Sequence, residues 1–202
     1  MITTQQTIAY TIDGRRYLSI TDRCTLACKF CPKTQGTMQV HDYDLTFRHR
    51  PETEEIIAAI GDVSNYSWVV FCGFGEPTLR LKTLLDVAHY VKQQGGRVRL
   101  NTDGLANLFH KRNVLPEMEG LIDALSVSLN AQDETTYNHH CVPALENSWQ
   151  AMLDFLELAP TSIADVTATA INGLAGVDIE ACRVLAENRG VKFRQRELGF
   201  VG

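Results

Sequence analysis

The chain has 202 residues, of which 45% are hydrophobic and 21% charged, and its 19 basic and 24 acidic side chains give a net charge of −5. This composition predicts one folded domain over residues 1–202 and excludes a disordered chain. The longest apolar stretches, such as Trp68–Cys72, are too short for a membrane helix, and the N-terminus has no signal-peptide pattern, so we expect a cytoplasmic protein. The acidic balance argues against nucleic acid as a partner.

The first elements are strands. Two strand-like runs flank an Asp13-Gly14 step, which predicts a hairpin with a two-residue turn. Tyr17–Ile20 is then the first core strand. The polar residues 32–51 follow without helical periodicity. Loops of this length in a compact domain are usually functional or mobile.

From residue 52 onward, helices and strands alternate. The apolar periodicity predicts helices over 52–60, 79–94, 105–112, 144–158 and 178–188, and strands over 68–72, 98–101, 124–129, 166–171 and 191–198. Counting the first core strand, six strands alternate with helices, which favours parallel β/α units. A complete eight-unit barrel needs about 250 residues. We therefore predict an α/β fold, a partial (β/α)6 TIM-like barrel with an N-terminal hairpin extension, and no appended domain after the sixth strand.

Three of the six cysteines, Cys24, Cys28 and Cys31, fall within eight residues. Thiolates this close in a reducing compartment usually hold a metal or an iron-sulfur cluster. Structural zinc requires four ligands, typically as two separated pairs, and the sequence has no second pair. Three ligands instead leave one iron of a [4Fe-4S] cluster open to a small molecule, so the pattern favours the cluster over zinc. The other three cysteines are expected to be core or surface thiols: Cys72 in a strand, Cys141 in a loop and Cys182 in a helix.

The segment Cys24-Thr-Leu-Ala-Cys28-Lys-Phe30-Cys31 reads CxxxCxxC with an aromatic residue before the third cysteine. Here the sequence resembles the radical S-adenosylmethionine (SAM) superfamily, and the resemblance extends over most of the chain. It implies that the three cysteines bind a [4Fe-4S] cluster and that SAM chelates the open iron. One-electron cleavage of SAM then gives a 5′-deoxyadenosyl radical that abstracts hydrogen from a substrate. Phe30 would pack against the adenine, or else within the loop.

Further motifs follow the predicted strands at their carboxyl ends, where folds of this type build their active sites. Gly73-Phe74-Gly75-Glu76-Pro77 resembles the Gly-Gly-Glu-Pro segment that binds the SAM amino group in the family, with Phe74 in place of the first glycine. A simple strand-to-helix turn is the alternative. Asn101-Thr102-Asp103-Gly104 resembles the family's Thr-Asn/Asp-Gly element. The residues from Ser126 to Asn130 carry small polar groups where relatives contact ribose and carboxylate.

The sixth predicted strand carries Arg194 and Arg196. They either protect an edge strand by their charge or point inward towards an anionic cofactor or substrate group. His139-His140-Cys141 is a candidate ligand or acid/base cluster in the substrate mouth. The resemblance and these patterns give the candidate cofactor contacts Phe30, Gly73, Phe74, Gly75, Glu76, Thr102, Asp103, Ser128, Asn130 and Arg196.

The resemblance thus implies a radical SAM enzyme, an oxidoreductase with a [4Fe-4S] cluster and SAM as cofactors. Without a second cysteine group we expect no auxiliary cluster, so an external one-electron donor of the flavodoxin or ferredoxin type is implied. The short length and the Gly-Phe-Gly-Glu-Pro variant are similar to a small radical SAM group associated with TatD-type nucleases. Glycyl-radical activases and deazapurine-forming enzymes are comparable in size.

The substrate is not identified by the sequence. An open barrel suits a bulky peptide or nucleic acid, or a small molecule covered by residues 32–51. Two rival functions are a noncatalytic iron-sulfur or zinc redox sensor and a scaffold that binds SAM without turnover.

Overall fold

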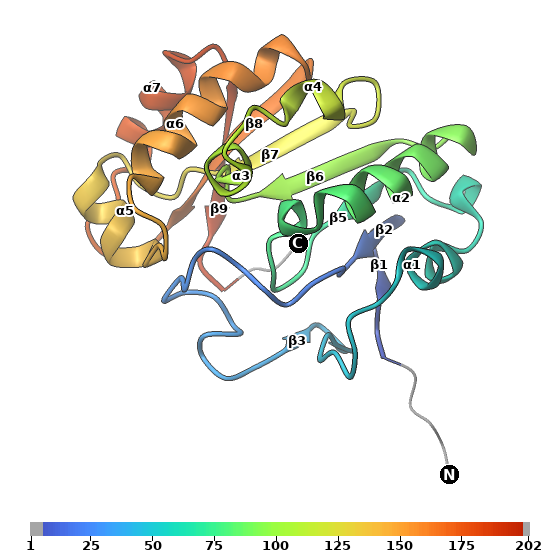
Figure 1. Cartoon of the computed structure of the whole chain (residues 1–202). Coiled ribbons are helices and arrows are strands. Elements are labelled where there is room, and N and C mark those ends of the chain that lie inside the picture. The colour runs from blue at the N-terminus through green and yellow to red at the C-terminus, as the bar shows by residue number, and fades with distance from the viewer. Residues whose placement is uncertain (1–5, 200–202) are drawn as a thin grey trace.

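A seven-stranded sheet forms the centre of the computed structural model, which describes residues 6–199 (Figure 1). The strands lie in the order β1-β2-β5-β6-β7-β8-β9. Only the first pair is antiparallel, and β2 and β5 to β9 are mutually parallel. The six parallel strands confirm the predicted partial barrel. The strands are β1 (Ala9–Ile12), β2 (Arg15–Leu18), β5 (Val69–Phe71), β6 (Val98–Thr102), β7 (Ala124–Ser128), β8 (Asp165–Asn172) and β9 (Lys192–Glu197).

The predicted hairpin is present between β1 and β2. Its turn residues Asp13 and Gly14 have φ values of 48° and 69°, as a type I′ turn requires. The first core strand runs from Arg15 to Leu18, not from Tyr17 to Ile20. The strand begins two residues earlier than predicted because Arg15, directly after the turn, already pairs with Ile12 across the hairpin.

Seven α-helices are described in residues 6–199, and two of them were not predicted. The helices are α1 (Thr53–Ile60), α2 (Leu81–Gln93), α3 (Ala106–His110), α4 (Leu115–Met118), α5 (Glu134–Cys141), α6 (Ser148–Leu158) and α7 (Ile179–Glu187). The short α4 was missed, and the polar sequence of α5 gives no amphipathic signal. The predicted helix over 144–158 begins only at Ser148, because Asn147 adopts a left-handed conformation with φ 58°. Single turns of 3-10 helix cover Val63–Asn65, Pro77–Arg80 and Ala159–Thr161.

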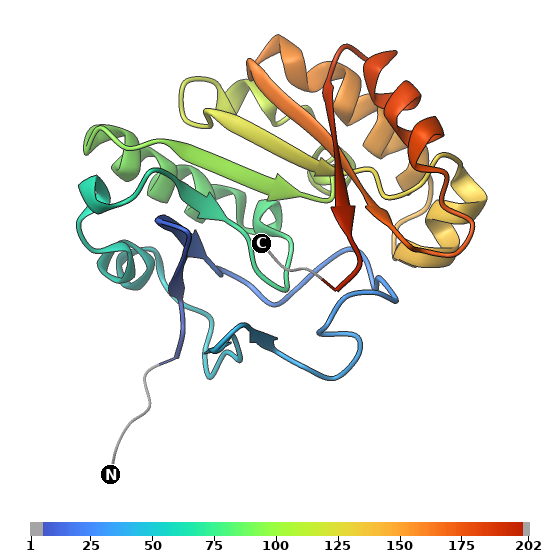
Figure 2. The same ribbon diagram turned by 180° about the vertical axis from the view of Figure 1, so that it is seen from behind.

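The two faces of the sheet differ. All seven helices contribute buried or partly buried side chains to one hydrophobic core with Leu18, Phe71 and Leu100 from the strands, and Figure 2 shows the face that carries no helix. A smaller hydrophobic cluster covers only the part of that face near β1, β2 and β5. It includes residues of the predicted loop 32–51, in which β3 (Gln39–Val40) and β4 (Tyr43–Asp44) form a short hairpin. The β6 to β9 part of this face is therefore not covered by that cluster.

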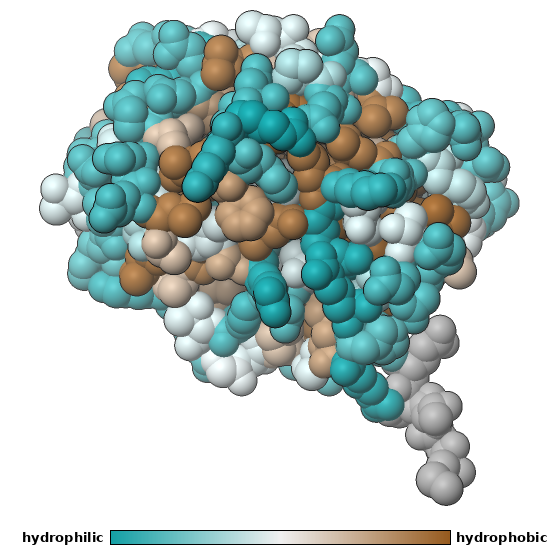
Figure 3. Space-filling model, in the orientation of Figure 1, coloured by the Kyte–Doolittle hydropathy of each residue, from teal (hydrophilic) through white to brown (hydrophobic). Residues whose placement is uncertain are grey.

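No helix within residues 6–199 is both long and apolar enough to span a membrane. The helix side of the molecule shows a mixed surface, in which hydrophobic residues emerge in small groups between hydrophilic ones (Figure 3).

Candidate active site

The loops that follow β2, β5, β6 and β7 meet at the carboxyl edge of the sheet, and the cysteine motif lies in the first of them. Because neighbouring parallel strands end at the same edge, residues far apart in sequence come together there. The cysteine loop is hydrogen-bonded to the loop after β5 through Glu76 N, which donates to Arg23 O at 2.8 Å. The cysteine loop is also hydrogen-bonded to the loop after β6 through the Thr25 hydroxyl, which donates to Asp103.

The cysteine loop also lies against the end of α5. Ala27 N donates to Cys141 O at 3.1 Å, and Lys29 N donates to His140 O at 2.9 Å. On the other side of the loop, Ala144 N donates to Thr25 O at 2.9 Å. A helix that the sequence pattern did not reveal therefore fixes the backbone of the cysteine motif.

The placement of Cys141 corrects the sequence analysis, which assigned it to a loop. Cys141 is the last residue of α5 and is fully buried. Its thiol interacts with that of Cys28, and Asn130 Nδ2 donates to its sulfur at 3.7 Å. Cys72 likewise lies just after β5 and not within it.

The environment of the Cys24 and Cys28 thiols favours their protonated form. Hydrogen bonding to Cys141, and then burial, raise the pKa of Cys28. Although Cys24 as a residue is exposed, desolvation of its sulfur and the charges of Asp103 and Glu76 raise its thiol pKa. A metal reverses this balance because coordination stabilises the thiolate. Without a metal, these two thiols therefore stay protonated at neutral pH.

Three cysteine thiols on one loop are a donor set of the kind that an iron-sulfur cluster takes. Within residues 6–199, no three His, Cys, Asp or Glu side chains converge on one point where an ion could bind. Cys28 packs beside the main core, whereas Cys31 packs beside the smaller cluster. A [4Fe-4S] cluster binds each thiolate at a different iron, so its ligands do not share one point.

Two buried carboxyl groups, Glu76 and Asp103, lock these loops together. Glu76 Oε2 accepts from Asp103 N at 2.7 Å, and Glu76 Oε1 accepts from the Thr102 hydroxyl at 2.9 Å. Asp103 in turn accepts from Thr25 and, through Oδ1, from Leu105 N at 2.9 Å. Burial raises the pKa of both carboxyl groups. Both carboxyl groups accept hydrogen bonds from other residues of the chain, so the contacts described for them are structural.

The unfolding free energy of the cluster-free protein is expected to fall as the pH rises from about 5 towards 8. Burial, followed by the charge of Asp103, raises the pKa of Glu76 to about 8. The folded protein therefore keeps a proton that the unfolded chain releases above the ordinary carboxyl pKa. This contribution is fully present below that ordinary pKa and is lost as the pH rises through about 8, with a slope of up to about 1.4 kcal/mol per pH unit.

Urea unfolding followed by circular dichroism at several pH values checks this expectation. Glu76→Gln should flatten the slope because the amide does not titrate. Glu146→Gln, at an exposed position just before α6, is the matched control and should keep the wild-type slope. An unchanged slope in Glu76→Gln would contradict the assignment.

The two glycines after β5 lie where a side chain has no room. A Cβ at Gly75 would overlap the carbonyl oxygens of Thr21 and Arg23, and a Cβ at Gly73 would press on Ser19. Phe74 between them is 7% exposed and packs in the smaller hydrophobic cluster with Tyr17 and other residues. The residue that departs from the family motif therefore serves packing.

The remaining candidate residues surround the same edge. Phe30 is partly buried against the main core. Asn130 is buried and has φ 61°, and its Oδ1 atom has no hydrogen-bond partner in the described part of the chain. Ser128 ends β7 and is half-buried. Arg196 lies on edge strand β9. Burial raises the pKa of the Cys72 thiol, and the positive charge of Arg196 opposes this shift.

The His139 and His140 pair is not arranged as a free acid/base pair. His140 is 6% exposed, and its Nε2 lies 2.7 Å from Ala175 O. The exposed His139 contacts Lys29 Nζ at 3.3 Å. These histidines connect the end of α5 to its neighbours.

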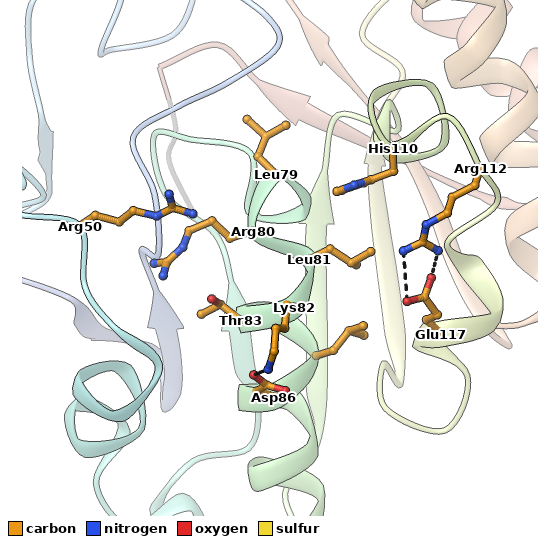
Figure 4. Close-up of a pocket in the computed structure, with 11 residues that line it drawn as sticks. Arg50, Leu79, Arg80, Leu81, Lys82, Thr83, Asp86, His110, Arg112 and Glu117 are labelled. Atoms are coloured by element: carbon orange, nitrogen blue, oxygen red, sulfur yellow. Dashed lines mark hydrogen bonds and ion pairs between the residues drawn. The ribbon is translucent and has the colours of Figure 1, made fainter.

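A separate hollow of about 470 Å³ lies on the helix side, next to α2 and α3 (Figure 4). Its acidic residues are already paired, since Asp86 binds Lys82 and Glu117 binds Arg112. Arg80 in its wall donates to Ile20 O and Pro51 O. None of the candidate cofactor contacts lines this hollow.

Comparisons with known proteins agree with this arrangement. The family model described as the radical SAM superfamily matches residues 18–187. A curated relative, the Fe-coproporphyrin III synthase of Methanosarcina barkeri (strain Fusaro / DSM 804), is 33% identical over 87 residues. The matched segment is 43% of this chain and 20% of that protein.

Solved structures share the fold. TYW1 with a lysine-pyruvate adduct bound has a TM-score of 0.65 at 16% identity, covering 93% of this chain and 66% of that one. Streptococcus suis SuiB bound to precursor peptide SuiA has a TM-score of 0.68 at 12% identity, covering 91% and 39%. Methylornithine synthase (PylB) has a TM-score of 0.59 at 16% identity, covering 91% and 53%. This chain thus spans a fifth of the curated relative and 39% to 66% of these three solved chains.

Proposed function

Because this chain belongs to the radical SAM superfamily, we propose that it is an enzyme that holds a [4Fe-4S] cluster on Cys24, Cys28 and Cys31 and binds SAM beside it. When bound, these groups supply the one-electron cleavage of SAM and the 5′-deoxyadenosyl radical that takes hydrogen from a substrate. The observation that carries the proposal is the bonding of the cysteine loop to the loops after β5 and β6 and to the end of α5.

The protein's own residues supply position and polarity. Three thiolates leave one iron open, and the missing side chain at Gly75 lets the loop after β5 approach the cysteine loop. Glu76 and Asp103 hold these loops at fixed spacing. The unpaired Oδ1 of Asn130 offers a buried acceptor to a ligand N–H group, since a buried acceptor without a partner is costly.

An external electron donor belongs to this proposal. Cys24 is exposed, and the exposed side chains around it include Arg23, Lys29 and Lys33. A positive surface beside the cluster attracts an acidic partner and accelerates its encounter. An acidic protein of the flavodoxin or ferredoxin type is therefore the proposed donor.

The test is anaerobic reconstitution with iron and sulfide, followed by incubation with SAM and dithionite and chromatographic measurement of 5′-deoxyadenosine. Formation of 5′-deoxyadenosine is the expected result. A cluster that is reduced by dithionite, as seen by electron paramagnetic resonance, without any SAM cleavage would contradict the proposal and favour a redox sensor or a SAM-binding scaffold.

A further inference from the structure

A second hollow, of about 210 Å³, lies on the face of the sheet that carries no helix. Its lining includes Arg15 from β2, Trp68 before β5, Arg99 from β6, Thr167 from β8 and Arg194 from β9. Trp68 packs against the smaller hydrophobic cluster, and the other lining residues are outside it. The hollow is here called the arginine pocket.

Strand alternation directs the arginines to this face. Val98 and Leu100 on either side of Arg99 are buried in the helix-side core, so Arg99 lies on the opposite face. Phe193 also packs against that core, which places Arg194 on the same face as Arg99. Leu125, Val127, Val166 and Ala168 are buried in the helix-side core, so β7 and β8 present the small side chains of the residues between them to this face. These include Ala124, Ser126, Thr167 and Thr169. Long cationic side chains therefore border a floor of small ones.

These cations are not neutralised by the protein. Within residues 6–199, the side chains of Arg15, Arg99 and Arg194 have no ion-pair or hydrogen-bond partner. Asp165, the carboxylate of the lining, is paired with Lys192 Nζ at 3.0 Å. Burial and the proximity of Arg194 lower the pKa of Arg99, so the two guanidinium groups oppose one another's charge. An anion between them would relieve this repulsion.

We propose that the arginine pocket binds the anionic group of the substrate, a carboxylate or a phosphate, through Arg99 and Arg194. The planar guanidinium fork matches both oxyanions and binds them bidentately. Asn101 lies on the same face, two residues closer to the carboxyl edge, and its buried Oδ1 lacks a partner in the described chain. A substrate anchored by its anion extends along β6 to β8 towards the cysteine loop. The inference rests on the proposed function and names its substrate class.

Trp68 makes the test direct, because it lines the pocket and the chain has only two tryptophans. In a Trp149→Phe background, Trp68 is the sole tryptophan reporter. The full chain, with its cluster reconstituted and also without it, is titrated with inorganic phosphate and separately with succinate. We expect a saturable change in Trp68 fluorescence with at least one of these anions, and the tighter of the two identifies the preferred oxyanion.

Arg99→Gln and Arg194→Gln should each weaken this binding by at least about tenfold, because each removes a charge-assisted hydrogen bond. Arg99→Lys, which keeps the charge, should recover part of the affinity. The matched control is Arg112→Gln, whose guanidinium pairs with Glu117 on the helix side of the molecule. It should titrate like the parent.

No saturable response to either anion, or equal weakening by Arg112→Gln, would overturn the proposal. Urea unfolding identifies any variant that fails to fold, and the decision then rests on the other arginine. No SAM is present in these titrations, so they are independent of catalysis. Anion binding without 5′-deoxyadenosine formation would refute only the proposed function, whereas SAM cleavage without arginine-dependent anion binding would refute only the pocket.

Discussion

Replacing any one of Cys24, Cys28 and Cys31 with alanine is expected to reduce bound iron and sulfide to background and to abolish 5′-deoxyadenosine formation. Each thiolate is the sole protein ligand of one iron in the proposed cluster, so its loss leaves two irons without a protein ligand. Iron and sulfide analysis per chain, with electron paramagnetic resonance of the reduced protein, measures the effect.

Cys182→Ala is the matched control because this cysteine is buried on α7 within the helix-side core. The variant should be somewhat less stable, since a buried apolar group is removed, but it should bind iron normally. Iron loss in Cys182→Ala equal to that in the three motif variants would show that the ligand assignment is wrong.

Cys141 provides a further test, because its thiol interacts with that of Cys28. If the open iron is reserved for SAM, Cys141→Ala should keep the full iron content. A loss as complete as in Cys28→Ala would instead make Cys141 a fourth protein ligand. That result would remove the coordination position on which SAM binding depends.

Gly75→Ala is expected to lower the unfolding free energy by about 2–3 kcal/mol and to prevent most cluster loading. The added methyl group would overlap the carbonyl oxygens of Thr21 and Arg23. These are backbone atoms of the segment that enters the cysteine loop, and they cannot move away without moving Cys24. The hydrogen bond from Glu76 N to Arg23 O would be disturbed as well.

Urea unfolding and iron content together measure this effect. Gly96→Ala is the control, because its Cβ would press on side-chain atoms of Val63 and Val91 at the other end of the sheet. It should cost stability through the same overpacking while the folded fraction still loads iron. Normal iron content in folded Gly75→Ala would show that the close approach of these loops is not needed for the cluster.

Several features of the molecule follow from local pattern alone. The Asp13-Gly14 step predicted the hairpin, and the alternation of apolar runs predicted the six parallel strands. The structure differs from the predicted elements where the local sequence has only a weak preference for helix or strand. The polar helix α5 buries few residues, so periodicity does not reveal it, and Asn147 adopts a left-handed conformation that shortens α6.

The sequence by itself determined the cysteine motif and the family resemblance, because both depend on residue type and spacing within short segments. It also determined the partial-barrel fold, because the alternation of strands and helices can be read along the chain. Only the tertiary structure decided that Thr25 bonds to Asp103, that Cys141 lies against Cys28, and that Arg99 faces the same hollow as Arg194. These residues are 78, 113 and 95 positions apart in the sequence. Strand order and register bring them together, and no periodicity within one segment encodes which loops will meet.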